Sequence, residues 1–288
     1  MTSVSNQLRL YADGDSAERP ALPPKRSPLE LANRELLRPA SYRRGHHRLE
    51  PFSTAWLDEL ERKRYARHGI WLNAALEFGR HPGESILLIN PGLGCDAIRF
   101  LHSGSEVTLA LTENDDAKPI RANLDRHGLT APMVSLQGPS LPFADGAFDV
   151  VVMNGLYAGL DLPMLAEELF RILKCGGKAI GLLPAYFDAG YWQDLILPYQ
   201  RLYWRRPPDP TIAPKTTARQ LRASFARFSE HKVFKRQLRR SELPHLFRVL
   251  PLVVLERVFG RVLVMKAKKP ISAARIVHSI SAAEPLAA

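Results

Sequence analysis

The 288-residue chain is 45% hydrophobic, which suffices for one sizeable core, and no apolar run reaches the roughly 18 residues of a membrane-spanning helix. Its 40 Lys and Arg exceed its 29 Asp and Glu, and the net charge of +11 favours anionic partners such as nucleic acid or anionic lipid. The two cysteines offer no metal-ligand spacing or disulfide framework, and no charged-then-apolar leader opens the chain, so a cytoplasmic protein is predicted.

The first fifty residues are polar and contain several prolines and scattered arginines. This composition predicts an irregular N-terminal arm over residues 1–50. From about Thr54 to Phe78 the apolar residues recur at helical spacing, with Gly69 as a candidate break. We expect this helix to cover one face of a sheet and its aromatic side chains to pack in the core.

The most informative stretch is residues 86–101, ILLINPGLGCDAIRFL. An apolar run from Ile86 to Ile89 ends in Asn90-Pro91-Gly92-Leu93-Gly94, and helical spacing follows. A continuous apolar run closed by glycines indicates a buried strand of a parallel sheet. Glycines let the backbone approach a ligand closely, and the first N–H groups of the next helix can bind it. Because ligands of open α/β sheets bind beyond the carboxyl ends of the strands, this turn is the predicted ligand site.

Strand-like and helix-like segments alternate after this turn. Strands are predicted at about 107–111, 133–136, 148–153 and 179–183, and helices at about 114–127 and 163–173. Strands joined by helices predict right-handed crossovers and a parallel sheet covered on both faces. Near the end of the chain we expect an apolar helix at about 249–259, a strand at about 260–268 and a loose tail at 269–288.

Residues 201–240 form a basic segment with twelve Lys or Arg and only two acids, Asp209 and Glu230. Aromatic residues lie among these cations, and a helix is predicted at about 217–228. The sequence leaves three interpretations open. The segment could be a solvated charged face, a nucleic-acid site in which aromatics interleave with cations, or a surface that binds anionic lipid.

Three blocks of sequence resemble the class I S-adenosylmethionine-dependent methyltransferases of the type 11 kind. ILLINPGLGCDAIRFL resembles the family's first strand and glycine turn, LPFADGAFDVVVMNGLY its block leading into the fourth strand, and ELFRILKCGGKAIGLL its turn before the fifth strand. The resemblance implies an α/β, Rossmann-like fold with a seven-stranded, mostly parallel sheet, an antiparallel last strand and helices on both faces. The implied domain spans residues 51–268 and includes the basic insertion at about 201–240.

The resemblance also implies that S-adenosylmethionine lies across the carboxyl ends of the first, second and fourth strands. Gly92 and Gly94 match the turn under the methionine moiety, and Asp96 stands at the third glycine position, as in a similar subgroup. A cap of the following helix explains Asp96 equally well.

Three positions depart from the acids of the family: Asn90 after the first strand, Leu111 after the second and Gln137 after the third. Asn and Gln can still hydrogen-bond hydroxyls and amines, whereas Leu cannot. A shift of one or two residues would bring Glu113 to the ribose. The candidate cofactor-binding residues are Asn90, Pro91, Gly92, Gly94, Asp96, Thr112, Glu113, Gln137, Gly138 and Asn154.

The activity that the resemblance implies is in-line methyl transfer to a small-molecule or lipophilic acceptor. A sulfonium methyl group is already electrophilic, so the enzyme mainly has to position the reactants, and proximity supplies much of the acceleration. Accordingly, we expect no catalytic triad and no metal site. Asn154 and Tyr157 are the best candidates for contacts with the acceptor, although loop packing explains them equally well.

Two other functions fit parts of the sequence. Residues 92–97 match a G-x-G-x-x-A fingerprint, with Glu113 about 20 residues further on, as in a nicotinamide dehydrogenase. The second and third blocks have no place in a dehydrogenase. The replaced acids would suit a catalytically inactive, methyltransferase-like scaffold that binds a partner through its basic surface. Cofactor binding would separate the scaffold from the enzyme.

Overall fold

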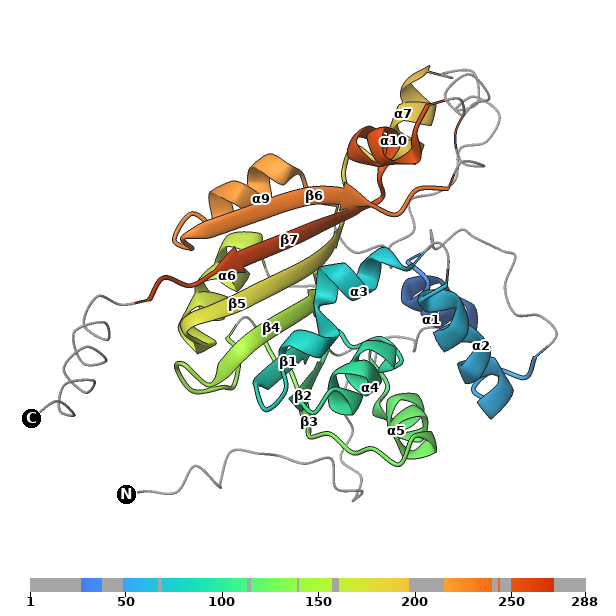
Figure 1. Ribbon diagram of the computed structural model, residues 1–288, viewed down its shortest axis with the longest axis vertical. Helices are drawn as coiled ribbons and strands as arrows, with labels where there is room; N and C mark the ends of the chain where they lie inside the picture. The colour runs from blue at the N-terminus through green and yellow to red at the C-terminus, as the bar shows by residue number, and fades with distance from the viewer. Residues whose placement is uncertain are drawn as a thin grey trace, which may run out of the picture.

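The helices and strands of the chain form one mixed sheet that helices cover (Figure 1). This computed structural model describes residues 27–37, 49–66, 69–112, 115–138, 140–156, 161–196, 215–239, 243 and 250–271. Within these residues no helix is both long and apolar enough to cross a membrane.

The sheet of the described residues has seven strands in the order β3-β2-β1-β4-β5-β7-β6. The strands are β1 (Ser85–Ile89), β2 (Glu106–Leu111), β3 (Met133–Ser135), β4 (Phe148–Asn154), β5 (Leu173–Pro184), β6 (Glu230–Arg236) and β7 (Val262–Lys268). Strands β1 to β5 pair in parallel, whereas β7 runs antiparallel to both of its neighbours. The predicted fold class and the antiparallel last strand are therefore confirmed.

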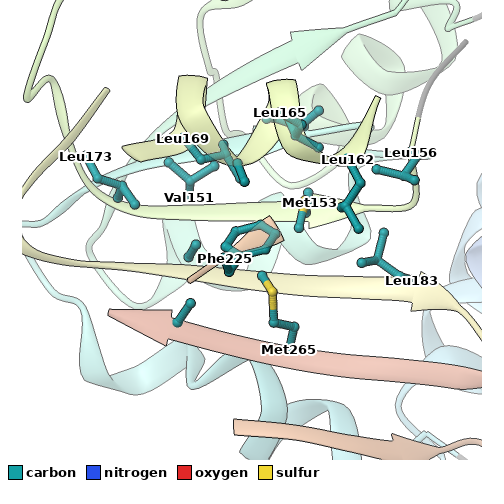
Figure 2. Packing of buried hydrophobic residues seen from close by; sticks show 14 of the residues in the cluster. Val151, Met153, Leu156, Leu162, Leu165, Leu169, Leu173, Leu183, Phe225 and Met265 are labelled. Carbon is teal, nitrogen blue, oxygen red and sulfur yellow. The ribbon is translucent and has the colours of Figure 1, made fainter. Parts of the chain in front are cut away.

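Alternate residues of the central strands form two cores, one on each face of the sheet. On one face, β1 and β4 pack against α6 (Leu162–Ile172) and α9 (Ala218–Ser224). Figure 2 shows this core, in which Leu169 of α6 lies close to Val151 of β4. Both faces are buried because each central strand is apolar at nearly every position, as a parallel sheet requires.

The second core lies on the opposite face of the sheet. There Ile86 and Leu88 of β1 pack with α3 (Trp71–Leu76), α4 (Cys95–His102) and α5 (Ala117–Arg126). These helices connect consecutive parallel strands or precede β1, and they hold the turn between β1 and α4 at one edge of the sheet (Figure 1).

The helix predicted over residues 54–78 consists of two helices, α2 (Thr54–Arg64) and α3, followed by the 3-10 turn η2 (Phe78–Arg80). Ser53 caps α2, because its hydroxyl accepts a hydrogen bond from the backbone N–H of Trp56 at 3.3 Å. Between the helices, an added Cβ at Gly69 would collide with the backbone carbonyl of Arg64. The break at Gly69 is confirmed, and close approach of the two backbones explains why glycine is needed there.

The prediction of an irregular arm over residues 1–50 is wrong for residues 28–35, which form helix α1 (Pro28–Glu35). Ser27 and Glu30 form a capping box: the backbone N–H of Ser27 donates to the Glu30 carboxylate at 2.8 Å, and the N–H of Glu30 donates to the Ser27 hydroxyl at 3.3 Å. Leu31 packs with Trp56 of α2 and with Leu93 of the glycine turn. Tertiary contact therefore stabilises a helix too short to persist alone.

The basic segment contains structure that the sequence did not predict. Strand β6 lies at the edge of the sheet, and its Lys232 and Lys235 are typical of edge strands, because charge discourages pairing with another chain. Outside this segment, helix α7 (Ala189–Ile196) was also missed, whereas α10 (Leu252–Phe259) lies within the predicted helix.

The aromatic side chains of the basic segment do not support a nucleic-acid site. Phe225 and Phe228 are buried in the core beside α6, so they cannot stack on nucleic-acid bases. Of the other candidate aromatics, Phe234 of β6 is partly buried against the second core, whereas Tyr203 and Trp204 fall outside the described residues.

Candidate functional site

The turn between β1 and α4 brings a strained backbone to the carboxyl edge of the sheet. Asn90, Gly92 and Gly94 have φ values of 57°, 67° and 83°, all in the left-handed region. An added Cβ at Gly94 would lie 3.3 Å from Cγ2 of Ile120 on α5. The turn therefore needs glycine both for its backbone conformation and for close packing with α5. Pro91 closes the turn, since its carbonyl accepts the N–H of Gly94 at 3.0 Å.

A carboxylate from the N-terminal helix lies directly on this turn. The backbone N–H of Leu93 donates a hydrogen bond to Oε2 of Glu35 at 3.0 Å. Glu35 also occupies the space in which a Cβ of Gly92 would stand. The opening that the glycine provides is thus filled by a side chain of α1, which sequence reasoning did not foresee.

Glu35 belongs to a buried cluster of charged groups that is centred on Arg64. The Arg64 side chain is 3% exposed, and its Nε donates to Oδ1 of Asp96 at 2.9 Å and lies 3.7 Å from Oε1 of Glu35. A second Arg64 nitrogen pairs with the other oxygen of Asp96, and Tyr65 donates its hydroxyl to Asp96 at 2.8 Å. One guanidinium therefore faces two carboxyl groups beneath the glycine turn.

Burial and the neighbouring charges shift the pKa values of Glu35, Arg64 and the adjacent Cys95. Burial raises the pKa of Glu35 above its usual range, although the Arg64 guanidinium opposes the shift. Burial alone would lower the pKa of Arg64, but the carboxylates of Asp96 and Glu35 outweigh it, so that Arg64 remains protonated. Burial likewise raises the pKa of the Cys95 thiol well above its usual range. A neutral, buried thiol is a packing group rather than a nucleophile.

Asp96 does not act as the helix cap that was one of its two interpretations. Helix α4 has no side-chain cap at its N-terminus, although Asp96 lies in its first turn. The carboxylate instead accepts hydrogen bonds from Arg64, Tyr65 and Asn154, the last at 3.3 Å. Asp96 thus links α2, α4 and the end of β4.

The ends of β1 and β4 present two buried amide oxygens without a partner among the described residues. They are Oδ1 of Asn90 and Oδ1 of Asn154. The amide nitrogens are used: Asn90 donates to the carbonyl of Gly155 at 3.5 Å, and Asn154 donates to Asp96. An unsatisfied buried acceptor costs roughly 1–3 kcal/mol, so these oxygens suit a ligand that brings N–H or O–H donors.

After β2, the side chain that meets the site is Asp115, which sequence reasoning missed. Its Oδ2 accepts the backbone N–H and the hydroxyl of Thr112 at 2.9 and 2.8 Å. Leu111 points into the core and is 4% exposed, so it cannot contact a polar ligand. Glu113 lies outside the described residues. The cluster of acids after β2 was the available signal, but the sequence did not indicate which acid folds back onto the strand.

Helix α1 joins the three strand ends. Arg34 donates to Oδ1 of Asp115 at 3.2 Å and to the backbone carbonyl of Asn154 at 3.5 Å, while Glu35 holds the glycine turn. The structure thus brings together the predicted residues Asn90, Pro91, Gly92, Gly94, Asp96, Thr112 and Asn154. Gln137 and Gly138 follow β3, further along the same edge, and both are exposed. Tyr157 lies outside the described residues.

Residues 91–181, which begin within this turn, match a family described as "Methyltransferase domain". Two curated relatives are demethylmenaquinone methyltransferases. That of Corynebacterium urealyticum is 32% identical over 98 residues, 34% of this chain and 40% of the relative. That of Beutenbergia cavernae is 28% identical over 136 residues, 46% of this chain and 52% of the relative. The chain thus spans about half, or less, of the length of these relatives.

A solved structure shares the fold. Geranyl diphosphate C-methyltransferase from Streptomyces coelicolor A3(2) superposes with a TM-score of 0.51, over 77% of this chain and 86% of that one. The two sequences are 16% identical, so the likeness extends to the fold alone.

Proposed function

We propose that this chain, whose residues 91–181 match a methyltransferase domain, transfers a methyl group from S-adenosylmethionine to a small or lipophilic acceptor. The observation that carries the proposal is the pair of unpartnered amide oxygens, on Asn90 and Asn154, beside the left-handed glycine turn. They fit a cofactor whose ammonium, hydroxyl and amine groups all supply donors.

The residues that would hold the cofactor lie at three neighbouring strand ends. Asn90 and Asn154 would accept its hydrogen bonds, and the Glu35 side chain would have to leave the glycine turn before the cofactor could contact the backbone of Gly92. Asp115 supplies a carboxylate at the end of β2, and Arg34 and Thr112 already hold its two oxygens. Glu113, Gln137 and Gly138 remain candidates for the ribose and adenine side.

When bound, the cofactor supplies an electrophilic methyl group on a sulfonium, so the protein needs to position the acceptor and exclude water. The acceptor would approach past the end of β4, beside Asn154. Within the described residues, no group of His, Cys, Asp or Glu could hold a metal ion.

A lipophilic acceptor is favoured by two observations. Both curated relatives are named for methylation of demethylmenaquinone, although the match covers only part of each. In addition, Tyr186 and Phe187 follow β5 at the same edge as the glycine turn and are 47% and 39% exposed. Exposed aromatic side chains beside a site suit an apolar acceptor.

Calorimetric titration with S-adenosylhomocysteine, the demethylated product, tests the proposal. The wild-type chain should bind it, and Asn154→Leu should weaken binding by more than about tenfold, because the ligand's donor then loses its acceptor. Asn73→Leu is the matched control, since Asn73 is an exposed residue of α3. Absence of both heat and thermal shift at millimolar ligand would contradict the enzyme and favour the inactive scaffold.

A further inference from the structure

The excess positive charge of the chain is concentrated in one segment. Residues 201–261 contain fifteen Lys or Arg and four Asp or Glu, and this excess of eleven equals the net charge of the whole chain. The residues outside the segment are balanced, with 25 of each sign. Such a concentration of cations attracts anionic surfaces over a distance.

Helix α10 lies in this segment and exposes aliphatic side chains. Val253, Val254 and Val258 are 69%, 54% and 43% exposed, whereas Leu255 and Phe259 are buried. At 100° per residue the three valines occupy one side of the helix, and the exposed Arg257 lies between them. Adjacent apolar side chains on a surface mark an interaction site, and the positive charge of this segment favours an anionic partner.

The buried side of α10 packs on α7, and the two helices lie together at one end of the molecule (Figure 1). Lys235 of β6 ties α10 to the turn after β5. Its ammonium donates to the backbone carbonyl of Val258 at 2.8 Å and to that of Phe187 at 2.7 Å. The exposed Tyr186 and Phe187 are therefore held next to α10. We call Val253, Val254, Val258, Tyr186 and Phe187 the apolar end.

We propose that the apolar end docks on the surface of an anionic lipid bilayer. Aliphatic and aromatic side chains would insert at the level of the lipid headgroups, and the exposed Arg257 between the valines would face the phosphates. Single-stranded nucleic acid would require exposed aromatics for stacking, but among the described residues of this segment Phe225 and Phe228 are buried and Phe234 is partly buried. A second copy of the chain would bring two surfaces with the same positive excess together, so self-association is disfavoured.

Docking would have a direct consequence for the acceptor. Because β5 runs parallel to β4 and β4 to β1, the turn after β5 lies at the same edge of the sheet as the glycine turn after β1. The apolar end would thus place the edge with the candidate site against the bilayer, where a lipophilic acceptor dissolves. This last step rests on the proposed function, whereas docking itself needs no cofactor.

Sedimentation of the full chain with vesicles, without cofactor, tests docking. The protein should bind vesicles that contain phosphatidylglycerol more tightly than vesicles of phosphatidylcholine alone, and binding should weaken with salt. The double variant V253Q/V258Q should reduce the partition coefficient by more than about tenfold, because it removes apolar groups without changing the charge. Arg257→Gln should reduce it roughly fivefold, as expected for one cation near an anionic surface.

Two matched controls sit elsewhere on the surface. Met164→Gln removes a side chain that is 47% exposed on α6, and Arg121→Gln removes an exposed cation of α5; neither should alter vesicle binding. Thermal unfolding of each variant confirms that the fold is retained. Equal binding by V253Q/V258Q and the wild type, binding to RNA but not to vesicles, or self-association that these substitutions abolish would each overturn the proposal. Failure to bind S-adenosylhomocysteine would overturn the proposed activity and leave docking intact.

Discussion

Replacing Arg64 with Met should strongly destabilise the fold, because Arg64 joins α2 to the glycine turn. Its side chain is 3% exposed and pairs with Asp96 and Glu35. Methionine keeps the apolar stem but leaves both carboxyl groups buried without a cation. Removal of one partner from a buried ion pair typically costs about 3–5 kcal/mol. In a domain of this size, that loss should lower the melting temperature by roughly 10 °C.

Scanning calorimetry and urea denaturation of four proteins measure this effect: the wild type, Arg64→Met, Asp96→Asn and the double variant. The double variant should recover part of the loss, because a neutral amide no longer needs the guanidinium. Arg62→Met is the control on the same helix. The Arg62 side chain is 67% exposed and pairs with Glu59 on the surface, so its loss should cost less than about 1 kcal/mol. Equal losses at positions 62 and 64, or additive losses in the double variant, would refute the buried cluster.

Three further predictions concern the turn and the sheet. Burial would raise the pKa of Glu77, but hydrogen bonds from Lys178 and Lys266 lower it to about 2, so stability should fall as the pH drops from 4.5 towards 2. Glu77→Gln should lose less stability over that range, and a parallel decline would disprove the pairing. Gly94→Ala should cost about 1–2 kcal/mol in urea denaturation, because its φ is left-handed; a neutral result would show that the turn relaxes. Leu111→Asp should lower the melting temperature by burying a carboxylate, and an unchanged value would mean that position 111 faces the site.

Local patterns predicted the centre of the fold. The run at 86–89 is apolar throughout and the run at 148–153 is apolar except for Asp149, as is typical of strands buried on both faces. Strand β6 was missed because EHKVFKR is largely polar, and its pairing with β7 depends on residues about 30 positions further along the chain. Helix α1 was missed because its stability comes from packing on α2 and the glycine turn rather than from its own eight residues.

The candidate site likewise has one part that the sequence predicts and another part that appears only in the structure. The glycine turn could be located from the sequence because its glycines directly follow an apolar strand, and glycine is the residue that adopts left-handed backbone conformations most easily. Glu35, Arg64 and Asp115 act through partners 58, 32 and 81 positions away, namely Leu93, Asp96 and Arg34. No periodicity or spacing relates residues so far apart, so the side chains that fill the turn and fasten α1 over it appear only in the folded chain.

The position of β7 determines the order in which the strands of the sheet can pair while the chain is synthesised. Strand β7 lies between β5 and β6, and β6 is hydrogen-bonded within the sheet through β7 alone among the described strands. While the chain is being synthesised, β5 therefore has an open edge and β6 has no place in the sheet until residues 262–268 leave the ribosome. A chain shortened before Val262 would retain the glycine turn but expose a long strand edge, which is a template for aggregation.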